Sequence, residues 1–205
     1  MIAVEDTVLV LLAAGKSERF GDIGSKLDHE FLAHPLGLHV AIALEDMPFK
    51  ERVAVVDGCR IDYAQHGFRL VHNDDPERDM GSSVRLGVAC ARAQGAQAVV
   101  IALADMPRVT ATHVYRLLDA ADGPGAIVSS SDGVSPGPPA LFGRDMFDAL
   151  EAVSGDQGAR DLIQRGRHVV TAPAELIDVD TPEELEELRR LVHAPEAHTR
   201  PRARL

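Results

Sequence analysis

The stretch VLVLLAAGKSERFG, residues Val8–Gly21, decides the fold of this chain. Residues 8–12 form an unbroken apolar run, which is typical of a strand buried on both faces of a parallel sheet. Small residues follow, and then basic residues at Lys16, Arg19 and Lys26. Small residues let backbone N–H groups approach an anion, and cations neutralise it. The stretch indicates a phosphate-binding turn, with an ordinary strand-to-helix connection as the alternative.

Two common phosphate loops do not match this turn. A Walker loop needs a glycine five positions before its Gly-Lys-Ser/Thr, but Val10 stands there ahead of Gly15. The dinucleotide fingerprint needs glycines spaced two and three residues apart, and Gly15, Gly21 and Gly24 do not have that spacing. If this turn binds a phosphate, it does so through an arrangement other than these two loops.

Length and charge limit the function. A chain of 205 residues is long enough for one domain with a proper core. The net charge of −11 argues against a nucleic-acid or anionic-membrane surface. Cys59 and Cys90 match no metal-ligand spacing, and the nine histidines form no paired metal motif. The run Val8–Ala14 is too short to span a bilayer and has no cleavage-type flank, so we expect a cytoplasmic protein without a leader.

Apolar periodicity and turn residues predict alternating strands and helices along the chain. After the first strand, further strands are expected at residues 52–56, 68–72, 98–103, 125–128 and 168–172. Helices are expected at residues 36–44, 84–93, 110–121, 145–152, 158–165 and from Pro182 onward. This alternation predicts an α/β fold with a mostly parallel sheet.

Three details qualify this pattern. Ser82 or Ser83 is expected to cap the helix that follows, and Thr181 with Glu184 has the form of a capping box around Pro182. Residues 129–139 are rich in Ser, Gly and Pro and are interpreted as a long polar loop. The domain is predicted to span residues 1–192, with a mobile Pro- and Arg-rich tail at 193–205.

Carboxylates at strand ends are candidate metal ligands. Sheets of this kind place their sites beyond the carboxyl ends of the strands, which brings together the Gly15 turn, Asp105 and the Gly81 turn. Asp178 and Asp180 alternate in an extended segment and should face the same side. One or two carboxylates, completed by water and phosphate oxygens, are the usual ligands of Mg²⁺. Helix capping and solvent exposure are the alternatives for these side chains.

Together these stretches resemble the molybdenum cofactor nucleotidyltransferases, the family of the molybdopterin cytidylyltransferases and guanylyltransferases. The resemblance spans residues 8 to 190 and rests on Leu11–Gly21, Lys26-Leu27, Gly81-Ser82-Ser83, Leu103–Pro107, Gly155–Arg160 and Asp178–Glu183. It implies a single Rossmann-like α/β domain with a mostly parallel, partly mixed central sheet, of the nucleotide-diphospho-sugar transferase type. The stretch Gly155–Arg160 is similar to the cytidylyl branch in particular.

The resemblance also implies roles for individual residues. Catalysis would rest on Lys26, Arg19 and Asp105, the first two meeting the triphosphate. Asp105 and Asp180 would hold Mg²⁺, Asp180 being a better second ligand than Asp178. The residues implied in nucleotide binding are Leu12, Ala13, Ala14 and Gly15 through their backbone, with Lys16, Gly81 and Ser82. The residues implied in acceptor binding are Gly155, Asp156 and Arg160.

The implied reaction is attack by an acceptor phosphate oxygen on the α-phosphorus of CTP, or of another nucleoside triphosphate, with pyrophosphate leaving. The implied partners are a molybdopterin-type acceptor and an apo-molybdoenzyme. An ionised phosphate needs no general base, so positioning and charge neutralisation would suffice.

Departures from the family pattern keep two alternatives open. Gly137-Pro138-Pro139 stands where relatives have Gly-His-Pro, Asp28–Phe31 replaces an apolar run, and Gln157 replaces a frequent lysine. These positions concern the acceptor side, so a sugar phosphate or phospholactate acceptor is one alternative. A non-catalytic carrier of the molybdenum cofactor is the other, although a carrier has no need of Lys26 and Asp105.

Overall fold

The computed structural model describes residues 2–15, 20, 24–77, 79–155 and 157–193. Within these residues the main sheet has seven strands. They are β1 Thr7–Ala13, β4 Glu51–Val56, β5 Arg69–His72, β6 Ala98–Leu103, β7 Ile127–Ser131, β8 Pro136–Gly143 and β9 Arg167–Val170. The helices are α1 Leu38–Leu44, α2 Met80–Ala93, α3 Ala111–Ala120, α4 Phe147–Glu151, α5 Arg160–Arg165 and α6 Pro182–His193.

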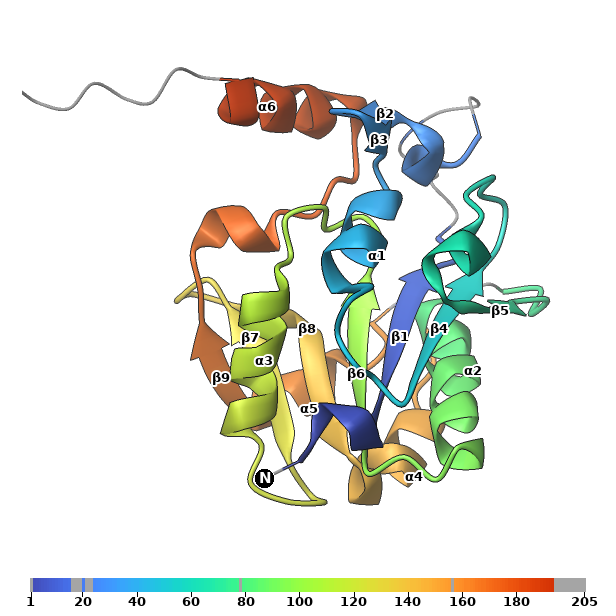
Figure 1. Cartoon of the computed structure of the whole chain (residues 1–205), viewed down its shortest axis with the longest axis vertical. Helices are drawn as coiled ribbons and strands as arrows, with labels where there is room; N and C mark the ends of the chain where they lie inside the picture. Colours follow the sequence, from blue (N-terminus) through green and yellow to red (C-terminus); the bar gives the residue numbers. More distant parts are fainter. Residues whose placement is uncertain (1, 16–19, 21–23, 78, 156, 194–205) are drawn as a thin grey trace, which may run out of the picture.

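The sheet has the order β5-β4-β1-β6-β8-β7-β9 (Figure 1). Strand β1 pairs in parallel with β4 and β6, β4 with β5, and β7 with β9. Among the described strands of this sheet, β8 alone runs antiparallel to its neighbours. The predicted Rossmann-like α/β fold with a mostly parallel, partly mixed sheet is confirmed.

Strand β1 is central because both of its faces are buried. Leu9, Leu11 and Ala13 pack in the core that includes α1 and α3. The alternate residues 8, 10 and 12 pack in the core that includes α2, α4 and α5. Alternate side chains of this all-apolar strand point into the two cores, which is why the continuous run Val8–Leu12 predicted a strand covered on each side.

The middle of helix α2 lies very close to β1. A Cβ atom added to Gly87 would lie 2.3 Å from Cγ1 of Val10. Only a glycine leaves room for this approach, since protein interiors are already densely packed.

A separate layer covers the edge of the sheet beyond the carboxyl end of β1 (Figure 1). It consists of α6 and the hairpin of β2 Glu30–Phe31 and β3 His34–Pro35. Phe31 and Leu36 pack there with Val179, Leu185 and Leu188. Because Val179 belongs to this third core, its packing holds the segment that precedes α6 near the carboxyl edge of the sheet.

Two local predictions were wrong. Residues 129–139 do not form a long polar loop, because Ser129–Ser131 end strand β7 and Pro136–Pro139 begin strand β8. The cap of α2 is Asp79 rather than Ser82 or Ser83, since the Asp79 carboxylate accepts a 2.6 Å hydrogen bond from the Ser82 N–H. From residue 194 on, the predicted tail lies outside the described residues.

The length and composition of the helices decide whether any of them could span a membrane. Among the helices of the described residues, none is both long and apolar enough to cross a bilayer.

Candidate active site at the carboxyl edge of the sheet

The carboxyl ends of β1 and β6 bring distant residues together at one edge. The Ala104 N–H donates to the carbonyl of Leu12 at 3.0 Å, which ties the end of β6 to the end of β1. Asp105 follows directly, and its carbonyl accepts a 3.0 Å hydrogen bond from the Val179 N–H. This second bond fixes the segment that carries Asp178 and Asp180 beside Asp105, although more than seventy residues of sequence separate them.

A buried lysine lies at the centre of this edge. Nζ of Lys26 is 2.8 Å from Oδ2 of Asp105 and 2.6 Å from Oδ1 of Asp180. The lysine side chain is 10% exposed, the Asp105 side chain 19% and the Asp180 side chain 37%. Burial alone would lower the pKa of Lys26, but the two carboxylates, Asp105 foremost, outweigh burial and raise that pKa. The ammonium is therefore fully charged at neutral pH.

A capping box holds Asp180 in place. Oε2 of Glu184 accepts hydrogen bonds from the N–H groups of Asp180 at 2.8 Å and Thr181 at 2.9 Å. The Glu184 N–H donates in return to Oγ1 of Thr181 at 3.2 Å. The predicted capping box is present, and its glutamate also fixes the backbone of a site residue.

Asp178 contributes to the negative charge of the same region. Desolvation raises the pKa of Asp178, and the nearby Asp105 and Asp180 carboxylates raise it further. Asp180 forms the ion pair with Lys26, and the preference for Asp180 over Asp178 as second metal ligand stays a prediction.

Two features of these carboxylates fit a divalent cation. Oδ2 of Asp105 and Oδ1 of Asp180 converge on one point, the position of the lysine ammonium. Oδ1 of Asp105 is buried, and no group of the described residues hydrogen-bonds to it. The described part of the chain contains no group of three or more His, Cys, Asp or Glu arranged around a metal position. Two carboxylates with water and phosphate oxygens are nevertheless sufficient for Mg²⁺.

The end of β1 forms a second part of the site. Leu12 and Ala13 are residues of the strand and are only 8% and 1% exposed as whole residues. We therefore expect them to contact a nucleotide through their backbone. Ala14 is also buried, and a Cβ atom added to Gly15 would have no described atom within 4 Å. The predicted roles of Lys16 and Arg19 lie outside the described residues.

The first turn of α2 forms a third part, and sequence reasoning missed two residues that shape it. Asn73, 2% exposed, donates from its amide to the hydroxyl oxygens of Ser82 and Ser83, each at 2.9 Å. Asp79 caps the helix at the Ser82 N–H. Asn73 follows the carboxyl end of β5, so the strand-end rule that singled out Asp105 also applied to it.

The predicted acceptor residues lie partly against this turn. The Gly81 N–H donates to the carbonyl of Gly155 at 3.0 Å, and Oδ2 of Asp79 accepts from the Gly155 N–H at 2.5 Å. Arg160 begins α5 and is exposed, and Asp156 lies outside the described residues. The structure thus brings Gly155 to Gly81, a predicted nucleotide-binding residue.

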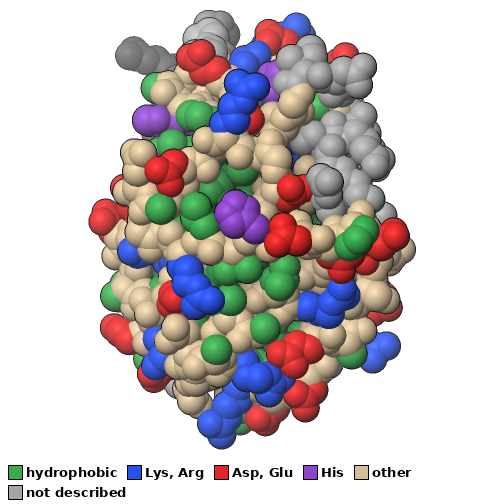
Figure 2. Space-filling model, turned by 90° about the vertical axis from the view of Figure 1, so that its right-hand side faces the viewer, with side chains coloured by type: hydrophobic (Ala, Val, Ile, Leu, Met, Phe, Trp, Pro, Cys, Tyr) green, Lys and Arg blue, Asp and Glu red, His purple; other side chains and the backbone are tan. Residues whose placement is uncertain are grey.

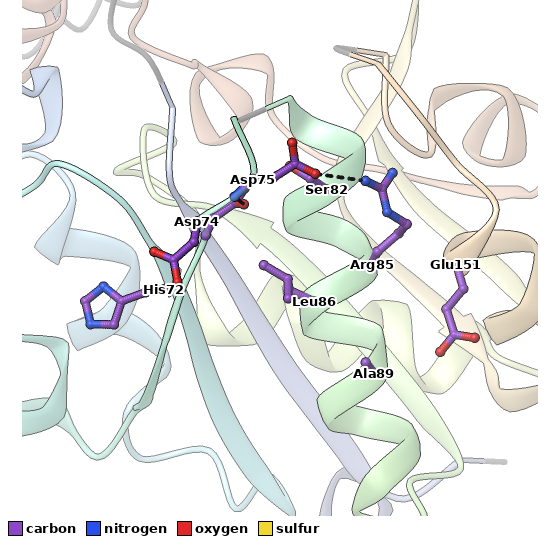
Figure 3. Close-up of a pocket in the computed structure, with 9 residues that line it drawn as sticks. His72, Asp74, Asp75, Ser82, Arg85, Leu86, Ala89 and Glu151 are labelled. Atoms are coloured by element: carbon purple, nitrogen blue, oxygen red, sulfur yellow. Dashed lines mark hydrogen bonds and ion pairs between the residues drawn. The ribbon is translucent and has the colours of Figure 1, made fainter. Parts of the chain in front are cut away.

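A hollow of about 500 Å³ adjoins the outer face of α2 (Figure 3). Asn73 and Ser82 are among the residues that line it, and two further lining residues, Arg85 and Asp75, form a 3.5 Å ion pair. Figure 2 shows that acidic and basic side chains are interspersed on this side of the molecule.

Comparison with known proteins identifies the family of this chain. The family model of the MobA-like NTP transferase domain matches residues 9–170. The purine catabolism protein PucB of Bacillus subtilis is 32% identical over 202 residues, covering 88% of this chain and 95% of PucB.

Solved structures agree with the fold. A homologue of Mycobacterium tuberculosis Rv0371c from Mycobacterium sp. strain JC1 has a TM-score of 0.76 at 24% identity, covering 93% of this chain and 98% of the other. A structure described as Rv0371c of Mycobacterium tuberculosis in complex with manganese has a TM-score of 0.66 at 20% identity, covering 90% and 98%.

Proposed function

Because the chain belongs to the MobA-like NTP transferase family, we propose that it transfers CMP from CTP to the terminal phosphate of a molybdopterin-type acceptor. An oxygen of the acceptor phosphate attacks the α-phosphorus of CTP. A new P–O–P bond forms, the bond between the α- and β-phosphates breaks, and pyrophosphate leaves with the electron pair. Family membership supports the nucleotidyl transfer, whereas CTP and the acceptor come from the sequence resemblance.

The observation that carries the proposal is the buried lysine between two carboxylates at the carboxyl ends of β1 and β6. Lys26 is charged and close to the strand end where the triphosphate is expected, so it can neutralise phosphate oxygens. No histidine, serine or cysteine base is needed for an ionised phosphate nucleophile. Orientation and charge neutralisation are then the main sources of rate enhancement.

The remaining roles are those that the family resemblance implies for individual residues. Leu12–Gly15 and Gly81-Ser82 would hold the nucleotide, and Gly155, Asp156 and Arg160 the acceptor. Lys16 and Arg19 would contact the triphosphate. Asp105 and Asp180 would hold Mg²⁺, which supplies further neutralisation of phosphate charge when bound. We place this activity in the cytoplasm, where the product would be passed to an apo-molybdoenzyme.

A panel of nucleotides tests this function. Pyrophosphate release is measured with CTP, GTP, ATP and UTP, each with and without the molybdenum cofactor. We expect release that requires the cofactor and is fastest with CTP. Equal or faster release with GTP would contradict the base preference, and release from no nucleotide would contradict the enzyme and favour a carrier.

A second acceptor class remains a specific alternative. It is motivated by Gly137-Pro138-Pro139, which stands where relatives have Gly-His-Pro. In this chain the carbonyl of Pro139 accepts a hydrogen bond from the buried Ser130 hydroxyl. If CTP turns over with a sugar phosphate or phospholactate but not with the molybdenum cofactor, this alternative replaces our acceptor assignment.

A further inference from the structure

We propose, building on the function above, that Lys26 occupies the metal position between Asp105 and Asp180 and has to leave it before a divalent ion binds there. Nucleotide phosphates would draw the lysine away, so nucleotide and metal would bind cooperatively. The lysine would then have two positions, one between the carboxylates and one on the triphosphate.

The geometry of the ion pairs supports an exchange rather than a shared site. The ammonium lies within 2.8 Å of the facing oxygens of both carboxylates. A metal ion ligated by the same two oxygens would need the space that Nζ now fills, because Mg²⁺ binds its oxygen ligands at short distances. An ammonium and a divalent cation would repel one another strongly at such short range. One cation therefore excludes the other.

The mobile partner in this exchange has to be the lysine. The backbone of Asp105 is tied to Val179, and the backbone of Asp180 is tied to Glu184. The lysine instead carries its charge on a flexible four-carbon stem. Its ammonium can turn toward the carboxyl end of β1, where the triphosphate is expected, while the two carboxylates keep their positions.

The exchange has a thermodynamic consequence. Metal alone must displace a well-paired ammonium, so it should bind weakly to the free protein. A nucleotide that accepts the ammonium on its phosphates removes that competition. By linkage, the metal must strengthen nucleotide binding by the same factor.

The test is a titration of the full-length protein with Mn²⁺ alone, followed by electron paramagnetic resonance. We expect Lys26→Gln to bind Mn²⁺ at least about tenfold more tightly than the parent, because the competing ammonium is gone. Lys50→Gln is the matched control, since it removes the same charge from an exposed position and should leave the affinity unchanged. The double variant Lys26→Gln with Asp105→Asn should lose the gain, which assigns it to this site. Equal or weaker binding by a folded Lys26→Gln protein would overturn the proposal.

A second measurement uses the unaltered chain, in case Lys26→Gln does not fold. Lysine acetylation by an amine-reactive reagent is followed by peptide mass spectrometry, with Lys50 as internal reference. Saturating Mn²⁺ should raise the labelling rate of Lys26 several-fold, and an unchanged rate would contradict the exchange. Neither readout involves turnover. A protein that transfers no CMP could still show the exchange, and an active enzyme could fail to show it.

Discussion

Replacing Asp105 with Asn separates the catalytic from the structural role of this carboxylate. The amide has nearly the same shape, so the change removes a charge and one ion pair while leaving packing intact. In the parent, Oδ2 lies 2.8 Å from the lysine nitrogen and the side chain is 19% exposed. Lys26 keeps Asp180 at 2.6 Å. We therefore expect a stability loss of about 2 kcal/mol, in the range for a hydrogen bond to a charged group.

The expected loss of activity is far larger. If Asp105 ligates the metal, its replacement removes several kcal/mol of charge stabilisation. At about 1.4 kcal/mol per tenfold, turnover should fall on the order of a thousandfold or more. A loss of about 2 kcal/mol should lower the Tm by only about 4–8 °C for a domain of this size.

The assay measures pyrophosphate release at saturating Mg²⁺ beside a thermal unfolding curve. Asp46→Asn, at an exposed position, is the control and should match the parent in both. Activity of Asp105→Asn within tenfold of the parent would refute the assigned role. A protein that no longer folds would refute the small structural role.

Three further outcomes are expected. Gly87→Ala should lower the free energy of unfolding by about 1–3 kcal/mol, because its methyl group would overlap the β1 core, whereas Gly125→Ala has open space and should not; equal urea midpoints would contradict this. Glu184→Ala removes the capping box and should lower the free energy of unfolding by about 1 kcal/mol; it should also weaken Mn²⁺ binding, because Asp180 loses its backbone partner. Glu184→Gln should restore both stability and Mn²⁺ affinity. A loss of stability without any change in Mn²⁺ affinity would exclude a role of Glu184 in positioning Asp180. Burial lowers the pKa of His113, so as the pH falls below about 6.5 the unfolded chain binds this proton and the folded protein does not. The free energy of unfolding should therefore decline below that pH. In urea unfolding measured from pH 8 to pH 5, His113→Gln should show a smaller decline than the parent.

Strand periodicity predicted most of the fold, because the runs at β1 and β6 are apolar on both faces. Strand β8 was missed for a local reason. Its first residues include Pro136, Pro138 and Pro139, and proline cannot donate to a sheet ladder, so the segment has the composition of a loop. The apolar run Ala140–Phe142 was the signal that could have revealed it.

The site was predicted as a set of residues but not as a geometry. The strand-end rule brought Gly15, Gly81 and Asp105 to one edge because it depends only on topology. The ion pair of Lys26 with Asp180 joins residues 154 positions apart and depends on how α6 and the β2–β3 hairpin pack. A single sequence carries no local signal for such a contact.

The central claim, nucleotidyl transfer, is tested most directly by following isotope from CTP. The protein is incubated with the molybdenum cofactor, Mg²⁺ and CTP labelled with ³²P at either the α- or the γ-position, and the products are separated. Our account predicts that the α-label enters the acceptor and that the γ-label appears in pyrophosphate, in equal amounts. Transfer of the γ-label to the acceptor, or retention of both labels in CTP during cofactor binding, would contradict it.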